Sequence, residues 1–336
     1  MIKNIQYKKL GEICDFVSGG TPSKSKNEYW KNGNIPWIKI SDFKEKYIKC
    51  SDEKITKNGL ENSSAKLLKK GTILYTIFAS VGKVAILDIE ATTNQAIVGV
   101  NLKENNLVDK DFLYYFLCSI ENNIKKQARG VAQNNNNINI SILKNVCIPI
   151  LPISSQKNIV KTLMRLEDIL ENFKQKQILI NFLSKSLFTT MFGDIKTNDK
   201  NWEIYYWKDV LNIKNGKNQK QVEDINGKYP IYGSGGIIGR SNAYICNENS
   251  IIIGRKGNIN KPILVKEKFW NVDTAFGLEV KSEKMSYHYL YYFCLFYDFE
   301  IHNKAVTIPS LVKSDLEKIL LPVPPIELQN KFAERI

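Results

Sequence analysis

The amino-acid sequence carries two copies of one pattern, and this duplication constrains the fold more than any other feature. Three pairs of segments match in the same order at offsets of 173 to 179 residues: 143–156 with 316–329, 112–117 with 289–294, and 93–96 with 272–275. The first pair reads LKNVCIPILPISSQ and LEKILLPVPPIELQ. Three matches in one order are improbable as a coincidence between apolar strands. The chain of 336 residues is therefore interpreted as a tandem duplication of one domain.

Each copy combines short strands with a helix. Runs of β-branched and aromatic residues alternate with Gly, Asn and Pro turns, which is typical of strands. The clearest runs are residues 35–40, 72–77, 84–87 and 251–253. An aromatic helix follows in each copy, and then a final strand that ends at two prolines. We predict an α+β fold class with two tandem repeated domains, residues 1–152 and 194–325, each a twisted sheet with helices.

A different pattern separates the two copies, at residues 153–193. Apolar residues recur at steps of three and four, which is typical of a heptad seam. Eight of the ten seam positions are apolar: Ile159, Leu163, Leu166, Leu170, Phe173, Ile180, Leu187 and Met191. The other two are Gln177 and Ser184. We predict a coiled-coil-type helix of ~38 residues, about 57 Å long, that joins the domains and ends near Gly193. A solitary helix would expose its seam, so the pattern predicts a partner helix on the apolar positions. A helix lying across one domain core is less favoured, because few globular helices are this long.

A second helix of the same kind begins within residues 326–336, after the second proline pair. Phe332 and Ile336 occupy the seam positions that Ile159 and Leu163 occupy in the first helix. The sequence stops after these two positions, which implies a natural truncation, a trimmed chain or a split gene. The sequence does not choose among the three.

The charge of the chain favours a polyanionic partner. Lys and Arg number 48 against 34 Asp and Glu, which gives a formal net charge of +14. Residues 1–150 hold 22 basic and 14 acidic side chains, whereas residues 196–336 hold 20 and 16. Nucleic acid is therefore favoured over a merely solvated basic surface. The first domain is expected to bind phosphates more strongly than the second.

Motifs of enzyme chemistry are missing from the sequence. There is no G-x-x-x-x-G-K-[ST] loop, and residues 233–239 miss G-x-G-x-x-G because Ile238 replaces the last glycine. The Pro-Pro pair follows a valine, so the Asn/Asp-Pro-Pro-aromatic signature of amino-methyltransferases is absent. His288 and His302 have no convincing nucleophile with an acid partner. We predict that the chain is not an enzyme and has no catalytic residue, metal or cofactor of its own.

Cysteine spacing and apolar patterning exclude two further classes. The six cysteines are scattered without a C-x-x-C pair, so we expect no structural zinc and interpret them as small buried residues. They are Cys14, Cys50, Cys118, Cys147, Cys246 and Cys294. The first residues lack the apolar core of a signal peptide, and no run reaches the ~18 apolar residues of a membrane helix. We expect a cytoplasmic protein without a membrane partner.

Together these motifs resemble the specificity (S) subunit of type I restriction-modification systems, over essentially the whole chain. The matching stretches are LGEI at 10–13, GGTP at 19–22, YW at 29–30, IPWI at 35–38, TNQ at 93–95 and the duplicated strand-P-x-x-P-I-x-x-Q. The second copy departs from the pattern, with NGKNQ at 215–219 and YPIYGSGG at 229–236 instead of GGTP and IPWI. The two halves are therefore expected to read different sequences.

The resemblance implies a role without catalysis. In that family each repeat is a target recognition domain that reads one half of a bipartite site in double-stranded DNA, and two long helices pack antiparallel as a spacer. The subunit docks two methyltransferase (M) subunits and, in the full complex, restriction (R) subunits. These partners would use S-adenosylmethionine, and ATP with magnesium where restriction subunits are present. The spacer helix would act as a ruler for the unread base pairs between half-sites.

Candidate DNA contacts are polar and basic residues in the loops, because Lys and Arg bind phosphates while Arg, Asn, Gln, Ser and Thr also read base edges. In the first domain they are Thr21, Lys24, Lys39, Ser41, Lys83, Asn94, Gln95, Arg129, Gln133, Asn134 and Asn135. In the second domain they are Lys217, Gln219, Ser234, Arg240, Arg255, Lys256, Lys261 and Lys304. Arg255 and Lys256 are the preferred pair, because the flanking Gly254 and Gly257 permit a close backbone approach. Asn94 and Gln95 fit a structural turn slightly better.

Two kinds of function remain open at this point. The favoured one is a non-catalytic specificity subunit that directs adenine methylation, and restriction where that subunit is present, to a bipartite site. The alternative is a truncated specificity-like module that occupies DNA sites or sequesters the methyltransferase as an anti-restriction device. An independent enzyme comes third. An adjacent methyltransferase reading frame would favour the first.

Overall fold

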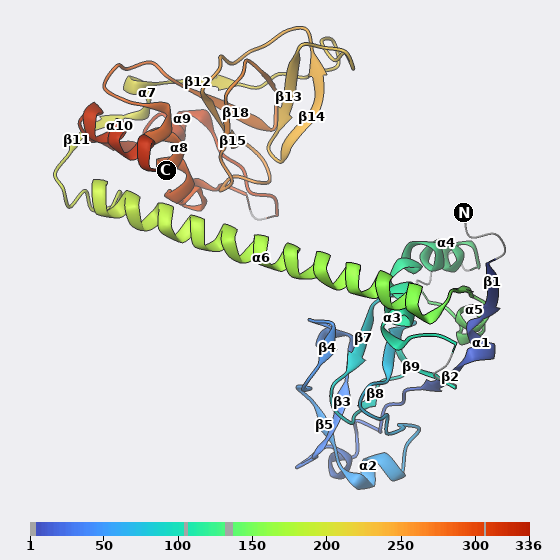
Figure 1. Cartoon of the computed structure of the whole chain (residues 1–336). Coiled ribbons are helices and arrows are strands. Elements are labelled where there is room, and N and C mark those ends of the chain that lie inside the picture. Colours follow the sequence, from blue (N-terminus) through green and yellow to red (C-terminus); the bar gives the residue numbers. More distant parts are fainter. Residues whose placement is uncertain (1–4, 104–106, 132–136, 306) are drawn as a thin grey trace. The chain divides into compact units, whose positions relative to one another are not determined.

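The computed structural model forms two compact units, Met1–Glu171 and Asn172–Ile336 (Figure 1). It describes residues 5–103, 107–131, 137–305 and 307–336, and for residues 127–131 the backbone alone. The predicted domains, 1–152 and 194–325, lie one in each unit. The boundary between the units falls inside the helix that the heptad seam predicts.

The described residues of unit 1 form three small sheets. The five-stranded sheet has the order β2 (Cys14–Ser18), β9 (Ile97–Leu102), β6 (Ile73–Thr76), β7 (Val84–Leu87), β4 (Tyr47–Ile48). The three-stranded sheet is β5 (Lys54–Ile55), β3 (Ile35–Ile38), β8 (Thr92–Thr93), and β1 (Gln6–Lys9) pairs with β10 (Cys147–Ile150). The helices are α1 (Leu10–Ile13), α2 (Lys57–Glu61), α3 (Lys110–Ser119), α4 (Glu121–Val131) and α5 (Ile140–Lys144), with short 3-10 turns η1 (Asn27–Tyr29) and η2 (Ile40–Asp42). In Figure 1 α3, α4 and α5 gather at one end of this unit, and β3, β5 and α2 at the other.

Unit 2 repeats this plan. Its four-stranded sheet has the order β12 (Leu211–Asn215), β18 (Ala275–Val280), β15 (Ser250–Gly254), β16 (Ile263–Val265). The three-stranded sheet is β14 (Gly236–Ser241), β13 (Tyr229–Gly233), β17 (Trp270–Asn271), and β11 (Glu203–Tyr206) pairs with β19 (Leu320–Val323). The helices are α7 (Trp207–Val210), α8 (Tyr287–Phe296), α9 (Lys313–Leu316) and α10 (Ile326–Arg335), with the 3-10 turn η3 (Phe299–His302).

The shared topology confirms both the α+β class and the duplication. β3 runs parallel to β8 as β13 does to β17, and β2 pairs antiparallel with β9 as β12 does with β18. Within the described residues each domain has three sheets where the sequence predicts one. The strands hold only two to six residues, which is too short for one sheet to span the domain.

The hydrogen bonds correct one detail of the internal match. The Asn94 amide donates to the Ile38 carbonyl at 3.1 Å, and the Val272 amide donates to the Tyr232 carbonyl at 2.9 Å. Asn94 and Val272 are therefore equivalent, and residues 93–96 match 271–274 at an offset of 178. The predicted match to 272–275 is wrong by one residue, because sequence alignment of a short turn ignores the register that strand pairing fixes.

Alternate residues of one central strand supply two cores in each domain. Ile73 and Tyr75 of β6 join the core that α3 covers, whereas Leu74 points to the second core between the sheets. In unit 2, Ile251 belongs to the core beneath α8 and Ile252 to the other. Because both faces of these strands are buried, their sequences are continuous apolar runs without alternation.

The predicted connecting helix is present as α6 (Ile153–Phe192), a single helix of 40 residues. It ends before Gly193, whose left-handed φ of +81° is the conformation glycine adopts at helix ends. Much of the predicted seam is exposed, with Leu170 at 60% and Phe173 at 65%. Leu166 and Ile180 are also exposed. An exposed apolar seam is what we expect of a helix whose partner helix is absent from the described part of the chain.

At its C-terminal end α6 packs into unit 2, one residue out of step with the predicted seam. Leu187 and Met191 are half-buried, whereas Phe188 and Phe192 are fully buried against Phe332 of α10. α10 begins where the second helix is predicted. The heptad spacing predicts the apolar stripe of α6 correctly. It does not predict that Phe188 and Phe192, rather than the adjacent Leu187 and Met191, are buried in the domain core.

Two buried glutamines fix the starts of α6 and α10 in the same way. Gln156 Oε1 accepts from the Asp109 amide at 2.8 Å, and its Nε2 donates to the carbonyls of Leu107 and Leu151 at 2.9 and 2.8 Å. Gln329 repeats all three bonds, with the Ser286 amide and the carbonyls of Lys284 and Pro324. Both side chains are 0% exposed. The glutamine of each P-I-x-x-Q motif therefore ties its own helix, α6 or α10, to the N-terminus of the aromatic helix, α3 or α8.

The cysteines are only partly as expected. Cys14, Cys246 and Cys294 are buried, and burial raises the pKa of the Cys14 and Cys246 thiols to about 12. Cys50 and Cys147 are exposed, so their interpretation as buried residues is wrong. Cys147 lies in β10, where alternate side chains of a two-stranded sheet face solvent.

In the described part of the chain no three His, Cys, Asp or Glu side chains are placed to bind a metal, and no helix there is long and apolar enough to cross a membrane.

Candidate nucleic-acid interface

In unit 1, hydrogen bonds join several candidate loops into one surface. The Thr21 hydroxyl in the loop after β2 donates to Oε1 of Gln95 in the turn before β9. The Ile77 amide, at the start of the β6–β7 loop, donates to the Ala96 carbonyl in the same turn at 2.8 Å. The Ile138 amide donates to the Ile77 carbonyl at 2.9 Å. The predicted residues Thr21, Asn94, Gln95 and Lys83 therefore lie on loops that brace one another.

A cluster of two tryptophans and two lysines flanks this surface. Lys24 and Lys39 both form ion pairs with Glu53, the second at 2.5 Å between Lys39 Nζ and Glu53 Oε1. The Lys24 ammonium lies 3.4 Å from the ring centroid of Trp30, in cation–π contact. Trp37 packs edge-on against Trp30 with centroids 5.0 Å apart.

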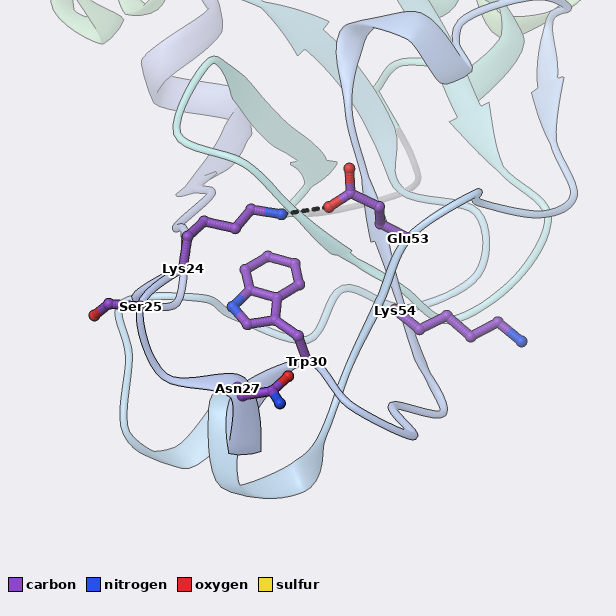
Figure 2. A pocket seen from close by; sticks show the side chains of 6 residues that line it. All are labelled: Lys24, Ser25, Asn27, Trp30, Glu53 and Lys54. Atoms are coloured by element: carbon purple, nitrogen blue, oxygen red, sulfur yellow. Dashed lines mark hydrogen bonds and ion pairs between the residues drawn. The ribbon is translucent and has the colours of Figure 1, made fainter.

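An open pocket of about 500 Å³ lies beside this cluster. Figure 2 shows Lys24 reaching over Trp30 toward Glu53 at this pocket. The Trp37 indole donates to the Gly20 carbonyl at 2.9 Å and so fixes the loop that carries Thr21. Trp30 and Trp37 belong to the YW and IPWI motifs, and Glu53 is not among the predicted DNA contacts. No local signal marks Glu53, because its partners lie far from it in the sequence.

Glu53 reduces the positive charge of this surface. Hydrogen bonds from the Lys24 and Lys39 ammonium groups lower the pKa of the Glu53 carboxyl, so it is ionised at neutral pH. One carboxylate thus faces two lysines that are predicted to bind phosphates.

Replacing Glu53 by glutamine is therefore expected to strengthen DNA binding. The change frees positive charge at two candidate lysines, so the slope of log affinity against log salt should steepen by up to about 0.9. Because the ion pairs are half-exposed, we expect the free energy of unfolding to fall by less than about 1 kcal/mol. The measurement is DNA affinity as a function of salt.

Glu61→Gln, at the exposed Lys57–Glu61 pair of α2, is the matched control. Weaker binding by Glu53→Gln would mean that the carboxylate holds the lysines in place for DNA.

In unit 2 the equivalent loops also converge. The Arg255 amide donates to the Thr274 carbonyl at 2.8 Å, and the Leu311 amide donates to the Arg255 carbonyl at 2.9 Å. A side chain at Gly257 would meet Ser234 Oγ at 3.7 Å, so the tip of the β13–β14 hairpin lies against the Arg255 loop. The structure thus brings Ser234, Arg255 and Lys256 together.

Three other predicted DNA contacts form hydrogen bonds or ion pairs within the domain itself. The Arg240 guanidinium donates to the carbonyls of Gly227 and Lys228 at 2.6 and 2.8 Å, and so holds the loop before β13. Lys304 forms an ion pair with Asp315 at 2.5 Å. The Gln219 carbonyl closes a turn by accepting from the amides of residues 222 and 223. The side chains of Arg240 and Lys304 and the backbone of Gln219 thus have structural roles, and contact of these residues with DNA stays a prediction.

The remaining candidates fall into two groups. Ser41, Lys83, Lys217 and Lys261 are exposed, with Ser41 in η2. Gln133, Asn134, Asn135 and the side chain of Arg129 lie outside the described residues. No described contact distinguishes the phosphate affinities of the two domains, so the stronger binding of the first domain stays a prediction.

Two domains of one topology, with different polar loops at equivalent positions and a long helix between them in the sequence, define a modular recognition protein. The chain belongs to the type I restriction modification DNA specificity family, whose model matches residues 2–181 and 199–336.

Named relatives agree with this assignment. The chain is 28% identical to the type I restriction enzyme MjaIX specificity subunit of Methanocaldococcus jannaschii, over 98% of this chain and 85% of that protein. It is 31% identical to the EcoR124I/EcoR124II specificity subunit of Escherichia coli, over 62% of this chain and 48% of that protein. The chain is also similar to the crystal structure of a type I S subunit from M. genitalium, with a TM-score of 0.62 and 20% sequence identity. The match covers 99% of this chain and 89% of that subunit, and it supports the fold.

Proposed function

We propose that this chain is the non-catalytic subunit that gives a type I restriction-modification system its DNA sequence specificity. Each domain reads one half of a bipartite site, and the chain directs methyltransferase subunits, and restriction subunits where they are present, to that site. The observation that carries the proposal is that the two domains share one topology but differ in the loops that meet at the candidate surface.

In this proposal the catalytic chemistry belongs to the partners. The methyltransferase subunits would bring S-adenosylmethionine, and restriction subunits would bring ATP with magnesium. This chain contributes binding: lysine and arginine side chains on phosphates, and polar side chains on base edges.

The exposed apolar seam of α6 supports the proposal that this chain binds a partner. It is also compatible with the alternative function, a module that only sequesters the methyltransferase. Leu170, Phe173 and Ile180 form an apolar stripe that a partner helix or a methyltransferase subunit could cover. A truncated module that only sequesters the methyltransferase would use the same stripe. The two functions differ in outcome, because sequestration produces no new methylated motif.

Domain substitution tests the proposed function. Residues 1–152 are replaced by the first recognition domain of another specificity subunit, and the methylated motif is mapped in cells that carry the matching methyltransferase. We expect one half of the motif to change while the other half and the gap stay the same. Substitution of residues 194–325 is the reciprocal control and should change the other half alone. A motif that changes in both halves, or in neither, would contradict the proposal.

A further inference from the structure

The β6–β7 loop of unit 1 and the β15–β16 loop of unit 2 are the same structural element. Ile77 and Arg255 open them, and each donates its amide to the turn before the next central strand at 2.8 Å. Each residue also accepts at 2.9 Å from one amide further along the chain, that of Ile138 or Leu311. The flanking strands pair in the same register, Leu74 with Ala85 and Ile252 with Ile263, so residues 77–83 correspond to 255–261 position by position.

The two loops also share two structural features. Ala79 and Gly257, the third residues, both have a left-handed backbone, with φ of +60° and +83°. Val81 and Ile259, the fifth residues, are both buried, at 3% and 1% exposure. A left-handed turn and a buried side chain thus position each loop beside the candidate surface of its domain.

The sequences of the loops have nevertheless diverged. They read IFASVGK and RKGNINK, and the one identical residue is the final lysine, Lys83 in unit 1 and Lys261 in unit 2. Both lysines are exposed, and neither forms an ion pair within the part of the chain that the structure describes. Lys24, Lys39 and Lys304, by contrast, are each paired with a carboxylate.

From this pattern we infer that Lys83 and Lys261 bind the equivalent backbone phosphate in the two half-sites. This inference rests on the proposed function. A phosphate contact carries no sequence information and can therefore stay the same in both domains, whereas positions that read bases must differ when the half-sites differ. At the first two loop positions Ile77 and Phe78 pack in the core of unit 1, whereas the exposed side chains of Arg255 and Lys256 are free to read bases in unit 2.

The test uses the full chain in complex with its methyltransferase subunits and the variants Lys83→Ala, Lys261→Ala and the double variant. We expect each single variant to lower DNA affinity about three- to tenfold and to reduce the salt slope by about 0.9. The two effects should be equal and should add in the double variant, and the methylated motif should stay the same. Lys57→Ala, which removes an exposed lysine of α2, is the control and should leave affinity and slope nearly unchanged.

Several outcomes would overturn the inference. An effect of one variant alone would show that the positions are not equivalent, and a changed motif would show base reading. Unchanged DNA binding with weaker assembly, measured by size-exclusion chromatography, would assign the lysines to the methyltransferase interface. If the unaltered complex shows no preference for any DNA site, the proposed function itself fails, which is a different result from the failure of these two lysines.

Discussion

Replacing Gln156 or Gln329 by leucine is expected to lower the free energy of unfolding of its own domain by roughly 3 kcal/mol or more. Each glutamine is wholly buried and makes three hydrogen bonds, two to carbonyls and one from an amide. Leucine has similar volume but leaves all three backbone groups without a partner, and each buried unsatisfied group costs about 1–3 kcal/mol.

Native-state hydrogen exchange measures this effect domain by domain, which a single melting curve of a two-domain chain does not. The Asp109 amide should lose protection in Gln156→Leu, and the Ser286 amide in Gln329→Leu, with little change in the other domain. Gln177→Leu, at an exposed position of α6, is the matched control and should be nearly neutral. Unchanged protection at Asp109 in Gln156→Leu would show that other contacts hold the start of α6.

Lengthening α6 by one heptad is expected to move the recognised half-sites apart. A duplicated copy of residues 170–176 adds seven helical residues, or about 10.5 Å at 1.5 Å per residue, and keeps the seam on one face. At ~34 Å per turn of DNA this corresponds to about three base pairs. The methylated motif should keep both half-sites and gain about three unread base pairs, and methylation at the original sites should be lost.

The control for this experiment keeps the length of α6 and changes only exposed polar positions outside the seam, and it should leave the gap unchanged. A lengthened variant that still methylates the original motif would show that α6 does not set the spacing. Loss of all methylation with intact complex assembly would show that the second domain no longer reaches DNA in register.

The features predicted from sequence are those with a long or repeated pattern. The predicted helix at 153–193 agrees with α6, Ile153–Phe192, because a seam of ten positions and a terminal glycine leave little choice. The repeated P-x-x-P-I-x-x-Q motif locates both final strands and both following helices. These signals are local in the sequence, so they need no knowledge of tertiary contacts.

The features that were missed depend on residues far apart in the sequence. Glu53 pairs with Lys24 and Lys39, and Trp37 bonds to Gly20, although nothing near position 53 marks it. The buried role of Gln156 requires its contact with Leu107 and Asp109. The equivalence of Lys83 and Lys261 appears only when backbone hydrogen bonds, rather than sequence similarity, align the two loops.

The central claim is that this chain determines which DNA sites a partner methyltransferase modifies. The most direct measurement is genome-wide mapping of methylated adenines in cells that express the methyltransferase subunits with this chain, compared with cells that lack it. We predict a bipartite adenine motif, two short half-sites with a fixed gap, that is present only with the chain. An identical methylation pattern in both kinds of cell, although the complex assembles, would contradict the claim.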